Sequence, residues 1–380
     1  MNALSDIDPE QVAVQSELGH ARPLTACHWD PSGRRIFFGA EDNGVHRYDL
    51  ASQEVTTLRH HDSWVRAIAA SPDGKTVVSG GYDGRLVWWP AEAEQPEPTR
   101  VVDDAHQGWI RGVAFSPDGR HLATCGNDRR VNLWDAVSGE LVASDDGHDH
   151  HVYNLAFRPE GDRLYSCDLH GYVRRWDLAA WLPAADARQP PQVGPPAETL
   201  TRLEQLHRYD TTFRADIGGA RCIAFSGDGE RLAFGGITNV TNAFAGVGEA
   251  AAVLVELSSV GKAAGNSDEA TGPEPKADGA GPEGDAAKPW VMTTQDKPRG
   301  TLWGIEQHAA GFWIGVAGGG GGGWLYFWRD GETEEFFKFK LKSDGRGMSL
   351  SPDGQQVAVA HADRHLRIYR LSAATDDPPA

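Results

Sequence analysis

The sequence predicts an all-β fold assembled from repeats of one short antiparallel unit. Three observations support this prediction. Alternating apolar runs of β-strand length recur along most of the 380 residues, Pro-Asp-Gly or similar turns separate them, and the spacing between marker residues is constant from unit to unit. Period-two alternation is typical of half-buried strands, and turns of this kind are typical of hairpins.

The unit at residues 106–135 shows the pattern most clearly. After His106 come an alternating run, a Ser-Pro-Asp-Gly turn, a second alternating run and a third that ends in Trp134-Asp135. The turn proline stands 11 residues after His106, Asp128 stands 22 after it and Trp134 stands 28 after it. One such unit cannot bury both faces of its sheet, so it must stack on copies of itself.

The same offsets recur in four further units. These units begin at His20, His61, His148 and Leu341. Each places a proline 11 residues after its start, Asp or His 22 residues after it, and Trp or Tyr 28 residues after it. Two altered units, around Gly227 and Ala309, lengthen the loop before the third strand by 11 and by two residues. The chain therefore contains seven units.

The pattern Gly-His, Ser-Pro-Asp-Gly, Asp and Trp-Asp resembles the WD-repeat family, whose units are about 40–45 residues long. The resemblance extends to stand-alone bacterial WD-repeat proteins, and it implies a scaffold with no particular substrate. It predicts a seven-bladed β-propeller of four-stranded antiparallel blades over residues 11–371. The last unit lacks an outer strand, so we expect the apolar run that starts at residue 11 to pair with the last blade and close the ring.

The regular pattern is interrupted at two places, and flexible tails are expected at residues 1–10 and 372–380. The insertion at about 178–200 is too rich in proline for a central strand, and we expect the outer strand to resume within 198–207. The insertion at about 258–289 contains no Val, Ile, Leu or aromatic residue between 261 and 288. Its composition predicts disorder.

Composition limits the classes of partner. Asp and Glu number 54 against 36 Lys and Arg, so the formal net charge is −18. Such a surface repels phosphodiester backbones and anionic lipids, which argues against general nucleic-acid or membrane binding. There is no apolar run of 18 residues, and the N-terminus lacks the basic start and apolar core of a signal peptide. We therefore expect a cytoplasmic, monomeric propeller.

Four cysteines occur, and no two form a Cys-x-x-Cys pair. They are Cys27, Cys125, Cys167 and Cys222. Three of them fall in or at the ends of alternating runs of regular units, and Cys222 falls in the corresponding run of an altered unit. We expect buried structural thiols, not metal ligands or disulfides.

A set of His, Ser or Thr, Asp and Trp repeats from unit to unit. The family resemblance implies a hydrogen-bonded network in which His contacts Asp and the hydroxyl, and the hydroxyl contacts the indole N–H. The expected members are His61, Ser79, Asp83 and Trp89 in blade two, His106, Thr124, Asp128 and Trp134 in blade three, and His148, Ser166 and Trp176 in blade four, with His170 in the Asp position. Repetition favours a structural role, because an active site needs one copy and buried polar groups must be paired.

Two other segments suggest chemistry, but their details do not fit it. The run from His148 to His151, with Asp145, Asp146 and His170, invites a metal hypothesis, but His150 and His151 are adjacent on an extended chain and no ligand spacing is met. The glycine run at 318–323 lacks the Gly-Lys-Ser/Thr ending of a phosphate loop. We therefore expect no catalytic residues, no metal and no cofactor.

Seven aligned positions near the start of the innermost strands are more informative. They are Thr25, Arg66, Arg111, Tyr153, Arg221, Trp303 and Arg346. Family geometry implies that they surround the mouth of the central channel on the narrow face, which is the face that receives the blade-to-blade loops. Four arginines and two aromatics suit a carboxylate, a phosphate or an acidic peptide, and Trp64 and Trp109 precede two of the arginines.

An alternative for these arginines stays open at this point. They could pair with loop aspartates such as Asp62, Asp149 and Asp216 and only rim the channel. Deciding between the two requires the positions of the carboxylates.

A second candidate site is expected where elaborated loops of blades five and six meet on the same face. These loops are residues 209–219, the Thr- and Asn-rich segment 235–248 and the glycine run. Long loops in a regular repeat are usually functional or disordered, and the Asn, Thr, Phe and Gly content of these favours ordered polar loops. The candidate residues are Arg214, Asp216, Asn239, Asn242 and Phe244.

The leading prediction is a non-enzymatic scaffold that binds a protein or acidic peptide on its narrow face. The alternative is a small-ligand binder or propeller enzyme that uses the loops of blades five and six.

Overall fold

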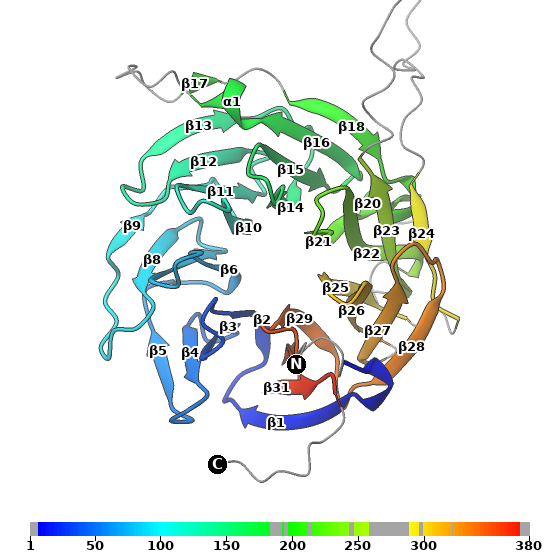
Figure 1. Ribbon diagram of the computed structural model, residues 1–380. Coiled ribbons are helices and arrows are strands. Elements are labelled where there is room, and N and C mark those ends of the chain that lie inside the picture. The colour runs from blue at the N-terminus through cyan, green and yellow to red at the C-terminus, as the bar shows by residue number, and fades with distance from the viewer. Residues whose placement is uncertain are drawn as a thin grey trace, which may run out of the picture.

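The computed structural model describes residues 7–182, 192–193, 197–211, 214–242, 247–257, 289–295, 299–320 and 322–372. They form a seven-bladed β-propeller, with antiparallel sheets arranged around a central channel (Figure 1). The predicted all-β fold is confirmed. Within these residues, no helix has the length and apolarity needed to cross a membrane.

Each blade has four antiparallel strands, to which blade three adds a short fifth, and in blades one to six the chain runs from the innermost strand outward. Blade one contains β2 (Leu24–Trp29), β3 (Arg35–Ala40), β4 (Val45–Asp49) and β5 (Val55–Leu58). Blade two contains β6 (Val65–Ala70), β7 (Thr76–Gly81), β8 (Leu86–Pro90) and β9 (Arg100–Val102). Blade three contains β10 (Ile110–Phe115), β11 (His121–Gly126), β12 (Val131–Asp135) and β13 (Leu141–Asp145). Blade four contains β14 (Val152–Phe157), β15 (Arg163–Asp168), β16 (Tyr172–Asp177) and β18 (Glu198–Arg202).

The remaining blades carry the irregular features. Blade five contains β21 (Ala220–Phe225), β22 (Arg231–Asn242), β23 (Val247–Glu256) and β24 (Trp290–Met292). Blade six contains β25 (Thr301–His308), β26 (Phe312–Gly318), β27 (Trp324–Arg329) and β28 (Glu335–Lys340). Blade seven contains β29 (Gly345–Leu350), β30 (Gln356–His361), β31 (His365–Arg370) and, from the other end of the chain, β1 (Ala13–Gly19).

The ring closes through β1, as predicted. It pairs antiparallel with β31 from Ala13 opposite Arg370 to Gly19 opposite His365. Of the expected tail at 1–10, residues 7–10 are described: Ile7 bridges Ser372, and the short 3-10 helix η2 (Pro9–Gln11) follows. Residues 1–6 and 373–380 lie outside the described residues. Both ends of the chain therefore meet in one blade.

The hydrophobic core is a ring of seven clusters, one between each pair of neighbouring blades. Trp88 of blade two packs with Trp134 of blade three, for example, and Phe38 of blade one packs with Leu366 of blade seven. Every blade buries both faces, because burial of apolar side chains stabilises by about 25 cal/mol per Å². The centre of the ring needs no apolar filling and can carry polar groups.

The turns between first and second strands explain the repeated Ser-Pro-Asp-Gly. In blade three the Ser116 hydroxyl donates to Asp118 Oδ1 at 2.6 Å, and Gly119 adopts a φ of 70°. The proline presets its own φ and only glycine adopts a positive φ without strain, so the motif marks this turn in the sequence.

Two segments, one before blade five and one within it, differ from the regular repeat. Of the segment 235–248, expected as a loop, residues 235–242 and 247–248 instead lengthen the β22–β23 hairpin, with Gly235 opposite Ala252 and Asn242 opposite Val247. Residues 209–219 contribute to an added hairpin, β19 (His207–Asp210) with β20 (Ala215–Gly218).

The insertion between β16 and β18 also contains structure. It begins with the one-turn helix α1 (Leu178–Trp181), and β17 (Gln192–Val193) then pairs with β13 as an outermost fifth strand of blade three. An edge position is where proline-rich sequence is tolerated in a sheet. The predicted disorder of 261–288 falls outside the described residues.

Candidate functional site

The mouth of the channel is built from one backbone device used seven times. Every innermost strand has a register shift, a β-bulge, one or two residues after its start. The bulge residues are Thr25, Arg66, Arg111, Tyr153, Arg221, Trp303 and Arg346. These are the seven positions that the alignment of units singled out. A bulge leaves one residue unpaired and re-aims its side chain, so each blade presents one side chain at the mouth.

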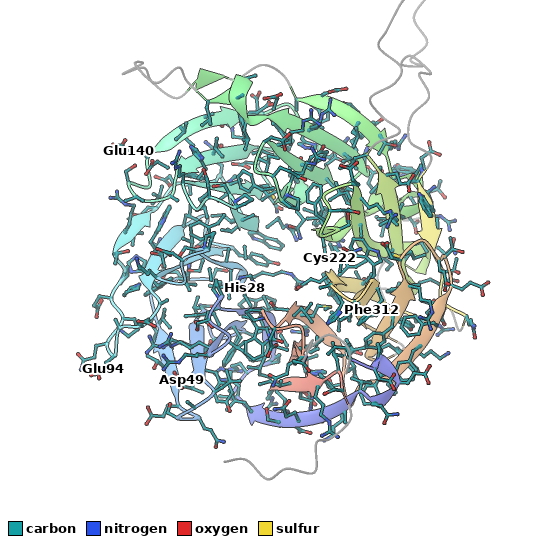
Figure 2. The ribbon with its side chains drawn as sticks, in the orientation of Figure 1. His28, Asp49, Glu94, Glu140, Cys222 and Phe312 are labelled. Atoms are coloured by element: carbon teal, nitrogen blue, oxygen red, sulfur yellow. The ribbon has the colours of Figure 1, made fainter. Side chains whose placement is uncertain are left out.

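The structure brings most of these side chains into one cavity. Arg66, Arg111, Arg221 and Arg346 line it together with Thr25 and Trp303, and its volume is about 580 Å³. Figure 2 shows Cys222 and His28 close to the channel, whereas Glu94 and Glu140 lie on the outer rim. The predicted arginines therefore converge and do not disperse around the rim.

Guanidinium groups and aromatic rings alternate along the mouth. The Cζ atom of Arg66 lies 4.1 Å from the Trp303 ring centroid, and that of Arg221 lies 5.9 Å from the same centroid and 3.9 Å from that of Tyr153. The Cζ atom of Arg111 also lies near the Tyr153 ring, 4.7 Å from its centroid. Such cation–π contacts fix the arginines without neutralising them.

The row of alternating arginines and aromatic rings continues outward from Arg111. Its Cζ atom lies 4.7 Å from the Trp109 centroid and 5.7 Å from the Tyr82 centroid, and the Tyr82 and Trp109 rings stack at 4.1 Å. Trp64 lies next along the face, 6.5 Å from Tyr82 between centroids. Trp64 and Trp109 remain 43% and 42% exposed, so an apolar wall stands beside the cationic mouth.

Three of the four arginines have no carboxylate partner among the described residues. Arg66 donates to the Arg346 carbonyl at 3.3 Å, Arg111 donates to Asn127 Oδ1 at 2.8 Å, and Arg221 Nε is buried without a hydrogen-bond partner. Arg346 alone pairs with an acid, Glu41, at 2.6 Å. The mouth therefore carries uncompensated positive charge.

The loop aspartates do not neutralise the mouth. Asp62 pairs with Arg85 at 2.6 Å, and Asp216 pairs with His170 and His207 at 3.0 and 2.9 Å. No ion pair joins Asp149 to a mouth arginine in the part of the chain that the structure describes. Pairing of Asp62, Asp149 and Asp216 with the mouth arginines, the alternative left open by the sequence, is therefore not found among the described residues.

The directions of the pKa shifts of Arg66 and Tyr153 agree with a shortage of negative charge at the mouth. Burial, with repulsion from Arg221, Arg111 and Arg346, lowers the pKa of Arg66 to about 10. Burial raises the pKa of Tyr153, but Arg221 and Arg111 more than offset it and leave that pKa lowered. An anion bound here would offset the positive charge of Arg111 and Arg221, which contributes to both shifts.

Three further residues that contact the mouth arginines were not predicted from the sequence. Glu41, Tyr82 and Asn127 each contact a mouth arginine, and each stands 21 residues after the start of its unit. The position just before the repeat Asp was the signal that could have revealed them. Glu306, on β25, lines the same cavity and was also missed, because a single Glu in an alternating strand carries no distinguishing mark.

The repeated polar set forms hydrogen-bonded chains in blades two and three. His61 bonds Asp83 through Nδ1 at 3.1 Å and Ser79 through Nε2 at 2.8 Å, and the Trp89 indole donates to Ser79 at 2.9 Å. His106, Asp128, Thr124 and Trp134 repeat the arrangement at 2.9, 2.7 and 2.9 Å. These groups are internally paired and leave no member free for chemistry.

Blade four corrects two expectations. His148 Nδ1 bonds Asp168 at 3.0 Å and not His170, because β15 ends at Asp168 and the chain turns there. His148 Nε2 bonds Ser166 at 2.6 Å, but the Trp176 indole donates to Asp145 at 2.7 Å and not to Ser166. His170 is thereby free of the structural network.

The structure describes the side chains of only three members of the predicted loop site, Arg214, Asp216 and Asn239. Arg214 is exposed, and Asn239 donates to Glu249 at 3.0 Å. A cavity of about 480 Å³ beside the long hairpin is lined by Asn239 but not by Asp216 or His151. Asn242 is described only as part of β22, and Phe244 lies outside the described residues.

All four cysteines are buried and free. Burial raises the pKa of each thiol, and Cys27 and Cys222 donate to backbone carbonyls of neighbouring blades at 3.4 and 3.7 Å. Their role is packing.

Comparisons with known proteins agree with the repeat pattern. The family model described as "WD domain, G-beta repeat" matches residues 52–90, 97–135 and 139–177. The chain is 41% identical over 56 residues to "Ribosome biogenesis protein ERB1" of Phaeosphaeria nodorum, covering 14% of this chain and 7% of that protein. It is 34% identical over 89 residues to "Ribosome biogenesis protein WDR12 homolog" of Chlamydomonas reinhardtii, covering 20% of each. It is 28% identical over 99 residues to "LEC14B protein" of Lithospermum erythrorhizon, covering 24% of this chain and 21% of that protein. The matches thus span only a minor part of each relative.

Proposed function

Because this chain is a WD-repeat β-propeller, we propose that it is a non-enzymatic scaffold that holds an acidic segment of a partner protein at the narrow-face mouth of its channel. The observation that carries the proposal is the convergence of Arg66, Arg111 and Arg221 on one cavity with no carboxylate partner among the described residues. A guanidinium binds a carboxylate or a phosphate through two parallel N–H···O bonds.

The aromatic wall supports a peptide rather than a bare ion as the ligand. Trp64 and Trp109 are among the few large apolar side chains exposed in the described chain. Tyr, Trp and Arg are the residues that most often dominate interface energies. An acidic side chain in the mouth and an apolar one against Trp109 would use both features together.

Preorganisation supports the same proposal. The arginines are held by bulges and stacked rings before any ligand arrives, so little side-chain entropy is lost on binding. The net charge of −18 also disfavours an acidic segment elsewhere on the surface, which improves specificity for the mouth. The proposal includes a cytoplasmic location, which fractionation of cells that express the tagged chain would test.

The test compares three proteins in affinity capture from native lysate. They are the wild type, the double variant Arg111→Ala/Arg221→Ala, and the control Arg34→Ala/Arg120→Ala, which removes the same charge from two exposed turn residues. We expect the wild type and the control to capture a partner that the double variant loses, with nearly equal melting temperatures for all three. Equal captures, or a large loss of stability in the double variant, would overturn the proposal.

A defined probe complements the capture. The anisotropy of a fluorescein-labelled peptide of alternating Glu and Phe should rise on titration with the wild type. The double variant should bind it at least about tenfold more weakly, a loss of about 1.4 kcal/mol. Added salt should weaken the wild-type interaction because exposed charges are screened.

A further inference from the structure

A second group of chemically active side chains lies at the junction of blades four and five. His207 Nε2 lies 2.9 Å from Asp216 Oδ1, and His170 Nε2 lies 3.0 Å from Asp216 Oδ2. One ligand atom from each of the three residues lies within 4.8 Å of the others. These three residues are named the His–His–Asp cluster.

The added hairpin brings the cluster together. His207 opens β19 and Asp216 lies on β20, and this two-stranded sheet belongs to no blade. It is held against the propeller by Arg208, which donates to the Val240 carbonyl at 3.1 Å. His170 is available to it because Asp168 takes the place beside His148. Among the described residues, only one other group of His and Asp places three ligand atoms this close together, at His20, Asp42 and His46.

We propose that His170, His207 and Asp216 bind a divalent first-row transition-metal ion of the Zn²⁺ type on the narrow face. Two imidazoles and one carboxylate are ligands that such ions prefer. In a tetrahedral site with bonds of about 2.0–2.1 Å, neighbouring ligand atoms lie ~3.3 Å apart. The two imidazole nitrogens lie 2.9 and 3.0 Å from different oxygens of Asp216, and one ligand atom from each residue lies within 4.8 Å of the others, so a bound ion would draw the three side chains toward this spacing.

The cluster is accessible and has an unused ligand atom. Its side chains are 17%, 11% and 29% exposed for His170, His207 and Asp216, so one side is open to water. His170 Nε2 is buried yet not aligned for a hydrogen bond with the carboxylate. The His150 ring stacks on His170 with centroids 3.2 Å apart, which places a further imidazole next to the cluster.

Arg202 contacts His207, and this contact competes with metal binding. Its Nη2 lies 3.4 Å from His207 Nδ1, the nitrogen on the far side of the ring. A metal on Nε2 requires the His207 proton on Nδ1, where it would face the guanidinium. Metal binding should therefore displace Arg202, and Arg202→Met should tighten it.

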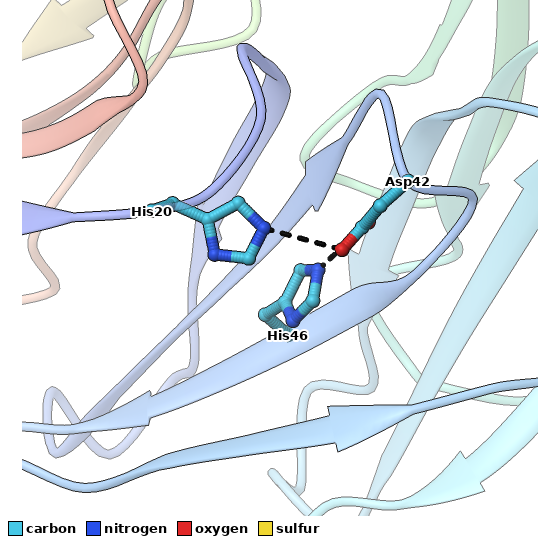
Figure 3. Close-up of side chains that lie close together, drawn as sticks. All are labelled: His20, Asp42 and His46. Carbon is cyan, nitrogen blue, oxygen red and sulfur yellow. Dashed lines mark hydrogen bonds and ion pairs between the residues drawn. The ribbon is translucent and has the colours of Figure 1, made fainter.

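A similar group in blade one provides a contrast (Figure 3). Both His20 and His46 point at Asp42, with Nε2–oxygen distances of 3.3 and 3.1 Å. His46 is only 1% exposed, stacks on Phe38 at 4.9 Å and bonds the Thr57 hydroxyl at 3.1 Å.

This blade-one group is a variant of the structural network. The His20–Asp42 pair corresponds to His61–Asp83 and His106–Asp128 in the next two blades. Its His46 side chain is 1% exposed, whereas each side chain of the His–His–Asp cluster is at least 11% exposed. It therefore serves as the matched control.

The test uses the full chain without an affinity tag, titrated with Zn²⁺ by calorimetry and with Co²⁺ by visible absorption. We expect one equivalent to bind, with the absorption bands of tetrahedral Co²⁺. Asp216→Asn and His207→Ala should each weaken binding by at least about 10–100-fold, whereas His20→Ala/Asp42→Ala should leave it unchanged. Asp216→Asn keeps the size of the side chain, so a loss of binding with unchanged circular dichroism cannot be attributed to unfolding.

Three outcomes would overturn the proposal. They are no binding of either ion to the wild type, unchanged affinity in both cluster variants, or loss of binding in the blade-one control. The Arg111→Ala/Arg221→Ala variant should bind the metal normally, so this inference stands or fails separately from the proposed function.

Discussion

At the scale of the residue, the bulge in each inner strand determines what the propeller offers to a ligand. Seven blades use the same backbone irregularity, yet its side chain differs from blade to blade, from Thr25 to Arg66 and Tyr153. The scaffold fixes the positions and the side chains supply the chemistry. Replacing bulge residues should therefore change binding without changing the fold.

The hydroxyl groups of the repeated network give a residue-scale prediction. Ser79→Ala removes the partner of both His61 and the Trp89 indole, whereas Ser166→Ala removes only the partner of His148. Each buried polar group left unpaired costs about 1–3 kcal/mol. Urea unfolding should therefore show a larger loss for Ser79→Ala, by about one such increment. Equal losses would contradict the assignment of Trp176 to Asp145.

The Trp134 side chain gives a second prediction at this scale. It is 4% exposed, packs between blades two and three and donates to Thr124. Trp134→Ala should lower the free energy of unfolding by about 3–5 kcal/mol, as large-to-small core changes do. Val137→Ala, at a side chain that is 85% exposed, is the control and should change it little.

Much of the residue-scale picture could be predicted because repeats make equivalent positions visible. The mouth residues and the chains in blades two and three followed from constant offsets. Asp168 could not be found this way, because an offset counts chain positions whereas a hydrogen bond depends on where β15 ends. Glu306 was missed because a burial environment has no sequence signature when it occurs once.

At the scale of the element, strand pairing overrode local composition. The Thr-, Asn- and Gly-rich segment 235–248 favoured a loop, but most of it continues β22 and β23, and Val240 is buried. Strand propensity reflects the neighbours that a residue packs against more than its own identity. The same holds for β19–β20, whose value lies in carrying His207 and Asp216 to His170.

The innermost strand of blade six carries a pH-dependent element. Burial raises the pKa of Glu306 from 4.5 to about 7, and its carboxyl accepts the Leu350 N–H at 3.2 Å. Between these values the folded protein keeps the proton that the unfolded chain releases. The free energy of unfolding should therefore fall as the pH rises through this window and level off above it.

Glu306→Gln tests this dependence because it keeps the acceptor and cannot ionise. Above about pH 7 the variant should be more stable than the wild type by about 1–3 kcal/mol, and below about pH 4.5 the two should agree. Urea unfolding at about pH 4.5, 6 and 8 measures the difference. A difference independent of pH would show that Glu306 titrates normally.

At the scale of the whole molecule, stability comes from seven interfaces that all depend on closure. Each hydrophobic cluster is shared by two blades, and the cluster between blades seven and one includes Leu18 at its edge. Val12 is buried in the neighbouring cluster between blades six and seven. Opening the ring at one point therefore weakens two clusters and exposes the edge of β31.

Deleting residues 1–19 should lower the melting temperature by about 10 °C or more and cause association through the open edge. Scanning fluorimetry and light scattering after size exclusion measure the two effects. A synthetic peptide of residues 7–19 added in trans should restore both, and a scrambled peptide should not. A truncated chain that melts as a wild-type monomer would show that β1 is dispensable.

The composition of the seventh blade also determines the order in which the propeller can assemble during synthesis. Its strands come from opposite ends of the chain, residues 13–19 and 345–370. During synthesis the first six blades can emerge and stack in order. Strand β1 stays unpaired until its partner β31 has been made. The mouth can therefore be completed only after β31 has emerged, and a ribosome that stops before it releases an arc with no closed channel.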